Sequence, residues 1–208
     1  MKHLLSALVM AAMICITAKA EEVIFSFGGT VHELDGEFNY FTGQPFEITY
    51  SFNRATNDAN PSDPESGQYI GAIKSGSLTI FTRDGALTWT VKPDGPYNII
   101  EVKDLDAVDS YSASASISGP EAGNEIPASF IIELIDEKAT ALSNDALPAS
   151  LKMASFGSQR IVLFTFIGAA KYTFSTIGII TSDNAPIPRD AEVHGEGMRP
   201  VVLRGQFR

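Results

Sequence analysis

Oxygen-bearing side chains are concentrated in one polar, proline-broken stretch of the sequence between Arg54 and Gly67. Calcium is a hard cation that takes about six to eight oxygen ligands, so this stretch is a candidate calcium site. It lacks the central glycine and the terminal glutamate that an EF-hand loop requires. A solvated, turn-rich loop is the simpler interpretation, and calcium binding is the alternative. The candidate ligands, all within nine positions, are Asn57, Asp58, Asn60, Asp63 and Glu65.

Three further aspartates, Asp104, Asp106 and Asp109, crowd a second corner of the chain. A solvated turn is again the simpler interpretation, because charge density alone is a weak indication of a metal site. Beyond the first twenty residues the sequence has two histidines, His32 and His194, and no cysteine. A zinc site with the usual histidine and cysteine ligands would therefore need carboxylates to complete it.

The sequence contains no motif that specifies an enzyme. It has no Gly-x-Ser-x-Gly turn to expose a hydrolase nucleophile, and Gly157-Ser158-Gln159 is an ordinary turn sequence. A glycosidase needs two carboxylates at a set separation, which the sequence alone cannot locate among 25 acidic residues. We therefore predict a protein that is not an enzyme, with no catalytic residues and no cofactor other than the calcium considered above.

The first twenty residues have the pattern of a secretory signal peptide. A charged start precedes an apolar run from Leu4 to Ile16, and Ala18-Lys19-Ala20 is a small-x-small cleavage site. We expect cleavage after Ala20 and a secreted or periplasmic protein. Because Cys15 lies within this segment, the mature chain would contain no cysteine, and its stability would depend on packing rather than on disulfides.

Charge and hydropathy narrow the classes of partner. The formal net charge is −10, and removal of residues 1–20, which include Lys2 and Lys19 but no acidic residue, makes it −12. Electrostatic repulsion argues against nucleic acid and anionic lipid surfaces. The excess of acidic over basic residues is explained either by solubility outside the cell or by divalent-cation binding. No apolar run after residue 20 approaches the roughly 18 residues of a spanning helix, so we predict no transmembrane helix.

Alternating hydrophobicity predicts strands along most of the mature chain. Between Gly43 and Phe52 the side chains of Phe46, Ile48 and Tyr50 share one face, which is the period of a half-buried strand. The other predicted strands span about residues 23–31, 70–83, 86–92, 97–102, 110–118, 130–135, 160–167 and 171–181.

One short turn sequence predicts a specific β-hairpin. Asp84-Gly85 separates two alternating runs, and a two-residue loop of this type is a strong hairpin signal. In the second arm Trp89 shares a face with Leu87 and Val91, so we expect the indole ring to lie in the core. The only plausible helical turn lies around Lys138 to Leu142.

About nine short strands and almost no helical periodicity predict an all-β fold. The expected architecture is an antiparallel β-sandwich, jelly-roll-like, with at most one short helix. We assign residues 1–20 to the signal peptide and residues 21–183 to a single β-sandwich domain. Residues 184–208 are rich in proline, glycine and charge, which indicates a flexible C-terminal segment whose end could add an edge strand.

Five segments of the chain carry a resemblance to a known group of proteins. They are Phe27-Gly28-Gly29-Thr30-Val31, residues 43–52, Gly67-Gln68-Tyr69-Ile70-Gly71-Ala72-Ile73, Leu134-Ile135-Asp136, and Leu142-Ser143-Asn144-Asp145-Ala146-Leu147-Pro148. In this order they resemble exported bacterial proteins that carry a PEP-CTERM sorting tail. The resemblance implies a surface or extracellular-matrix component of Gram-negative bacteria without an assigned activity. This chain lacks the Pro-Glu-Pro motif, apolar helix and basic end of that tail, so sorting by that route is not expected.

Two functions are compatible with these observations. The first is a structural or adhesion component of the cell envelope or extracellular matrix, with extracellular polysaccharide or other envelope proteins as partners. The alternative is a calcium-dependent or carbohydrate-binding module. In that alternative the loop from Asn57 to Glu65 holds the metal, and the aromatic side chains of Tyr40, Phe41, Tyr69 or Tyr97 are sugar-binding platforms.

Overall fold

The computed structural model describes residues 22–31, 41–122, 126–156, 159–167, 172–176 and 179–183. The predicted signal peptide, the segment 184–208, His32, Tyr40 and His194 lie outside these residues. Within the described residues, no helix is long and apolar enough to cross a membrane.

Eleven strands and one short 3-10 helix, η2, account for the regular structure of the described residues. Their bounds are β1 Glu22–Thr30, β2 Pro45–Asn53, β3 Ser66–Ile70, β4 Ile73–Thr82, β5 Gly85–Val91, β6 Ile99–Asp104, β7 Asp109–Ser118, β8 Ile126–Asp136, η2 Met153–Ser155, β9 Gln159–Ile167, β10 Tyr172–Thr176 and β11 Ile179–Asp183.

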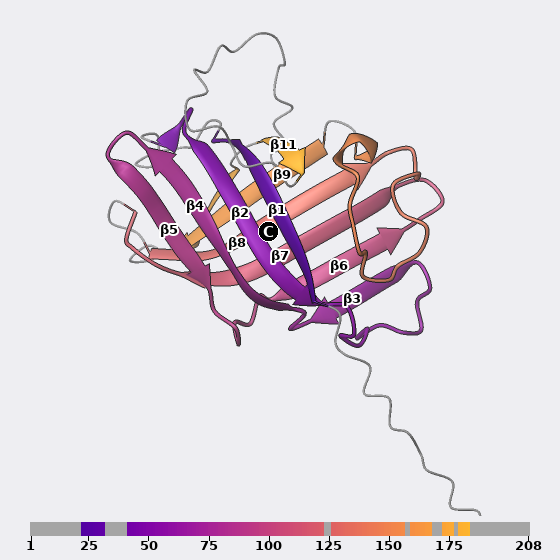
Figure 1. The fold of residues 1–208 in the computed structure, drawn as a ribbon. Coiled ribbons are helices and arrows are strands. Elements are labelled where there is room, and N and C mark those ends of the chain that lie inside the picture. Colours follow the sequence, from indigo (N-terminus) through magenta and orange to yellow (C-terminus); the bar gives the residue numbers. More distant parts are fainter. Residues whose placement is uncertain are drawn as a thin grey trace, which may run out of the picture.

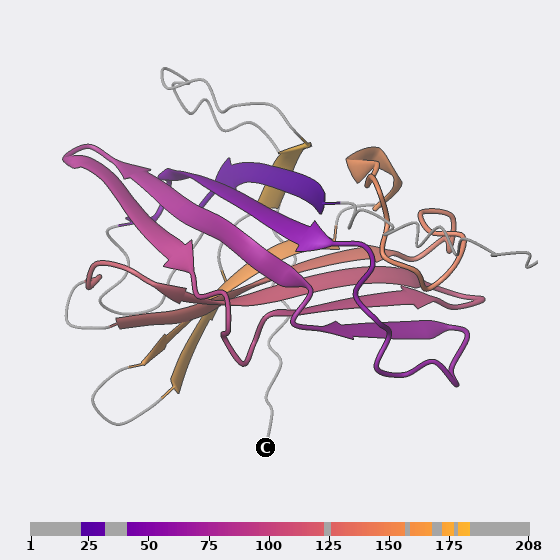
Figure 2. The same ribbon diagram turned by 60° about the horizontal axis from the view of Figure 1, so that its bottom comes forward.

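The strands lie in two layers that face each other (Figures 1 and 2). One layer contains β5, β4, β2 and β1, and the other contains β3, β6, β7, β8 and β9. Every described pair of strands is antiparallel, so the predicted all-β antiparallel class is confirmed. A short pairing between β5 and β7 at Thr90 and Val91 connects the layers.

The order of neighbouring strands is mostly sequential. The longest path runs β10-β9-β8-β7-β5-β4-β2-β1-β11, and β6 lies beside β7 with β3 at its outer side. A jelly roll instead contains two Greek keys, in which a long connection returns a strand beside an earlier one. The non-consecutive neighbours of this path are β7–β5, β4–β2 and β1–β11, and between β2 and β4 the chain passes through β3 in the other layer.

An aromatic core fills the space between the layers. Phe25 and Tyr50 come from the β1–β2 layer, and Tyr111 and Phe130 come from the β7–β8 layer. The ring centroids of Phe25 and Tyr111 are 6.0 Å apart, and those of Tyr50 and Phe130 are 6.3 Å apart. Strict alternation puts these residues inward, because successive side chains of a strand point to opposite faces.

The predicted strand over residues 70–83 is confirmed for the most part by β4, Ile73–Thr82, whereas its first residue, Ile70, ends the separate strand β3. The chain changes layers between these two strands, since β3 pairs with β6 and β4 pairs with β2. Gly71, with φ of +68°, makes the turn between them and donates its N–H to the carbonyl of Asn98. Glycine adopts this backbone conformation without the steric cost of a side chain.

The predicted hairpin is confirmed with a shift of one residue in its loop. Thr82 pairs with Gly85, so the two loop residues are Arg83 and Asp84 rather than Asp84 and Gly85. Gly85 has φ of +133°, and the hydroxyl of Thr82 donates to its carbonyl at 2.7 Å. The glycine is therefore the first residue of β5.

The tryptophan lies in the core as predicted, whereas the short helix lies outside the predicted segment. Trp89 is buried, as predicted, and its Nε1 donates to the carbonyl of Pro120 at 2.8 Å. The predicted helical turn at residues 138–142 is wrong, because these residues form turns and the short 3-10 helix lies at Met153–Ser155.

Candidate functional site

In the loop between β2 and β3, side-chain oxygens bind the loop's own backbone. Asp58 Oδ1 accepts the N–H groups of Asn60 and Gln68, both at 2.8 Å. Asp63 Oδ1 accepts the N–H of Glu65 at 3.1 Å. The bonds to Asn60 and Glu65 form Asx-type turns, in which the side chain accepts the N–H two residues on, whereas the bond to Gln68 fastens the loop to β3.

The five predicted calcium ligands are only partly brought together. Asn60 lies between two of its neighbours, with Nδ2 3.4 Å from Asp63 Oδ2 and 3.4 Å from the Ser66 carbonyl oxygen. Asn57 and Glu65 are exposed. Among the described residues, no group of three or more His, Cys, Asp or Glu side chains is arranged to hold a metal ion. Calcium binding by this loop stays a prediction.

A second set of carboxylates lies in a row across three strands. Asp104 at the end of β6 pairs with Asp109 at the start of β7, and Asp109 pairs with Asp136 at the end of β8. The row continues the inward-facing positions Val102, Tyr111 and Leu134. Three acidic side chains therefore end the core at one edge of this layer, a clustering that is destabilising unless donors or cations compensate it.

Both carboxylate oxygens of Asp136 accept hydrogen bonds from the loop that follows β8. Its Oδ1 accepts the N–H of Lys138 at 2.9 Å, and its Oδ2 accepts both the N–H and the hydroxyl of Thr140 at 2.8 Å. These bonds, led by the N–H of Lys138, hold the pKa of Asp136 below its usual range. The carboxylate thus ties the loop to the end of the strand.

Asp109 is buried, and only one of its two carboxylate oxygens has a hydrogen-bond donor among the described residues. Its Oδ2 accepts the N–H of Leu142 at 2.8 Å, which ties the same loop to β7. Its Oδ1 is buried and has no hydrogen-bond partner within the described structure. Burial, and after it the charge of Asp109, raises the pKa of the neighbouring Asp104. The two carboxyl groups therefore face each other.

The outer face of the β1–β2–β4–β5 layer carries hydroxyl groups in register. The row Thr90, Ser77, Thr49 and Ser26 crosses all four strands, and Thr79 pairs with Thr88 in the next row. The hydroxyls of Ser26 and Thr49 are 3.0 Å apart, as are those of Thr79 and Thr88. We call these six residues, Ser26, Thr49, Ser77, Thr79, Thr88 and Thr90, the hydroxyl face.

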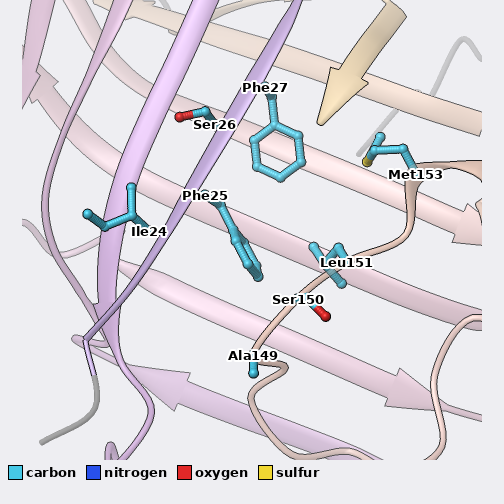
Figure 3. Close-up of a pocket in the computed structure, with 8 residues that line it drawn as sticks. All are labelled: Ile24, Phe25, Ser26, Phe27, Ala149, Ser150, Leu151 and Met153. Carbon is cyan, nitrogen blue, oxygen red and sulfur yellow. The ribbon is translucent and has the colours of Figure 1, made fainter. Parts of the chain in front are cut away.

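A small cavity lies between β1 and the segment before η2 (Figure 3). Phe25 and Phe27 form one wall, and Leu151 and Met153 form the other. Its volume is about 70 Å³, whereas sites for small organic ligands usually measure roughly 300 Å³ or more. The cavity can therefore take a few atoms at most.

The aromatic platforms predicted for sugar binding are only partly available. Phe41 is fully buried and lies edge-on to Trp89 with ring centroids 6.4 Å apart, so its prediction as a surface platform is wrong. Tyr69 is also buried, with its hydroxyl donating to the carbonyl of Asp145 at 3.0 Å. Tyr97 is 47% exposed, whereas Tyr40 is outside the described residues.

The sequence interpretation missed the buried carboxylate row, although the pattern contains a signal for it. Asp109 is in phase with the inward residues Tyr111 and Ala113, and Asp136 is in phase with Leu134. An acidic residue that continues an inward-facing row is expected to be buried and hydrogen-bonded. Asp104, Asp106 and Asp109 are close in sequence and resemble a single acidic turn, although Asp109 alternates with the inward residues of a strand.

The geometry defines an all-β protein whose notable polar features are the hydroxyl face on one layer and the largely buried carboxylate row at the edge of the other. Comparison of the chain with protein-family models, with curated proteins and with solved structures found no match.

Proposed function

We propose that this protein is an exported, non-enzymatic component of the bacterial cell envelope or extracellular matrix, with an adhesive role toward neutral extracellular polysaccharide. Export is supported by the signal-peptide pattern of residues 1–20 and by the resemblance to proteins of the PEP-CTERM group. The observation that carries the adhesive role is the hydroxyl face.

The hydroxyl face supports polysaccharide binding through its chemistry and its shape. Adjacent strands are about 4.8 Å apart, so hydroxyls in register form a regularly spaced array across the sheet. Each hydroxyl can donate one hydrogen bond and accept two, so those already paired with one another still have capacity for sugar hydroxyls. An extended polymer can contact such a surface without entering a deep pocket.

The charge of the chain supports a neutral rather than an anionic polymer. The formal net charge of −10 repels polyanions, as does Glu47, which lies opposite Thr79 on the same face, whereas a neutral glycan is not repelled and can bind the hydroxyls. Other envelope proteins are the second class of partner compatible with this face.

A glycan array tests the proposal directly. The purified protein should bind one or more neutral polysaccharides and should not bind sulfated or uronic-acid polymers. An array without any neutral glycan signal, repeated with and without added calcium, would refute the adhesive role toward polysaccharide.

A carbohydrate-binding module of the aromatic-platform type is a second candidate, favoured by the exposure of Tyr97. Its carbonyl accepts the hydroxyl of Ser114 at 2.6 Å, which fixes the backbone while the ring projects outward. Tyr97→Ala should reduce glycan binding strongly if sugars stack on this ring, because one stacking platform contributes a large part of such contacts. Unchanged binding by this variant would assign the interaction to the hydroxyl face.

A further inference from the structure

The row of carboxylates at the end of β6, β7 and β8 contains more negative charge than the described structure compensates. Asp136 is saturated by donors, but Asp109 has one buried oxygen, Oδ1, without a partner. Asp109 is 0% exposed. A buried carboxylate is costly unless a cation, a proton or hydrogen-bond donors offset its charge.

The neighbour of this orphaned oxygen is another acid. Asp104 and Asp109 are directly opposite in the β6–β7 hairpin, and Asp104 donates its own N–H to the carbonyl of Glu65 on the far side. The Asp104 N–H therefore points away from β7. This makes Asp104 and Asp109 a non-hydrogen-bonded pair, the type in which opposite side chains are closest. Two carboxylates in such a position repel each other, and a cation between them would offset the charge of both.

We propose that Asp104 and Asp109 bind one divalent cation, calcium in preference to magnesium, where the β6–β7 hairpin meets the loop after β8. Asp109 Oδ1 and the Asp104 carboxylate are its two acidic ligands. Because no third carboxylate completes a cluster among the described residues, backbone carbonyls and water supply the remaining oxygens. Calcium accepts such irregular sets, whereas magnesium requires a near-ideal octahedron.

The surroundings of the pair favour a cation electrostatically. Asp106 in the hairpin turn and Asp145 in the loop after β8 both contribute negative charge at Asp104. The loop already contacts the site, since Leu142 donates to Asp109 and the Asp145 carbonyl accepts the Tyr69 hydroxyl. A cation here would therefore fasten the hairpin and the loop together. The site does not depend on the proposed role in the envelope.

Thermal unfolding of the purified protein near neutral pH tests this site. About 5 mM calcium should raise the Tm of the wild type by about 5 °C relative to chelator, if the Kd is on the order of 0.1 mM, a value typical of extracellular modules. Magnesium at the same concentration should give a smaller shift. In Asp104→Asn the calcium shift should disappear, while the new amide can donate to Asp109 Oδ1 and keep the hairpin folded.

A matched variant separates this site from the loop between β2 and β3. The double variant Asp58→Asn, Asp63→Asn removes two charges there, but its amide oxygens can still accept the same backbone N–H groups. It should retain the calcium shift of the wild type. The proposal is overturned if calcium leaves the wild-type Tm unchanged, which would indicate a shared proton at the pair. It is also overturned if the shift persists in Asp104→Asn, or if magnesium matches calcium.

Discussion

At the scale of single residues, a buried pair of phenols joins the two layers of the fold. The hydroxyls of Tyr50 on β2 and Tyr111 on β7 are 2.7 Å apart, and both side chains are fully buried. Burial, and for Tyr50 also the proximity of Tyr111, raises the pKa of both phenols. Both are therefore neutral at physiological pH, and one hydroxyl donates a hydrogen bond to the other.

Removing one hydroxyl of this pair should destabilise the fold by more than the loss of one hydrogen bond, because the other hydroxyl stays buried. Tyr50→Phe or Tyr111→Phe leaves the other hydroxyl buried without its partner, which should lower the free energy of unfolding by about 1–3 kcal/mol. The double variant should lose clearly less than the two single losses combined, because no orphaned hydroxyl remains. Urea denaturation of the four proteins measures this coupling, and strictly additive losses would contradict it.

The Asp136 carboxylate should make the free energy of unfolding depend on pH in the acidic range. Since its pKa is lowered in the folded state, it stabilises the fold fully above its ordinary value of about 4. This contribution is lost as the pH falls through the lowered pKa. The stability difference between wild type and Asp136→Asn should therefore shrink on acidification, as followed by urea unfolding at a series of pH values. A difference that does not vary with pH would exclude this linkage.

At the scale of elements, close contact between β2 and β4 depends on a glycine. Gly76 lies opposite Tyr50, and a Cβ there would meet the carbonyl oxygen of Thr49 and lie 2.8 Å from Tyr50 Cα. These are backbone atoms of a central strand, which cannot move aside cheaply.

Gly76→Ala should therefore destabilise the fold by about 2 kcal/mol or more. Gly85→Ala is the matched control, because Gly85 also has a positive φ but has nothing within 4 Å of the Cβ position. Its loss should be about 1 kcal/mol. Equal losses in denaturant unfolding would show that backbone strain, rather than the contact with β2, limits Gly76.

The sequence predicts the strands better than it predicts their connections. Alternation identifies β2, β7 and β8 because one face of each is packed against the opposite layer. It cannot show that the chain changes layers at Gly71, since the residues on both sides keep strand-like composition. The hydroxyl face is visible in sequence as outward polar positions, but its register requires the pairing of four strands.

At the scale of the whole molecule, the two candidate binding features lie in different layers. The hydroxyl face belongs to the β1–β2–β4–β5 layer, and the carboxylate row belongs to the β6–β7–β8 layer. The two layers face each other (Figure 2), and the aromatic core fills the space between them. We therefore expect cation binding to raise stability without being required for glycan binding.

The adhesive role of the hydroxyl face is tested most directly by measuring polysaccharide binding after charge is placed on it. Thr88→Lys with Thr90→Lys changes two exposed positions of that face, and Ala59→Lys with Ser62→Lys changes two exposed positions in the loop between β2 and β3. Both variants add the same charge and should remain folded. We predict that affinity for the neutral polysaccharide bound by the wild type falls at least about tenfold in the first variant and stays unchanged in the second. Equal affinity in both variants and the wild type would contradict the assignment.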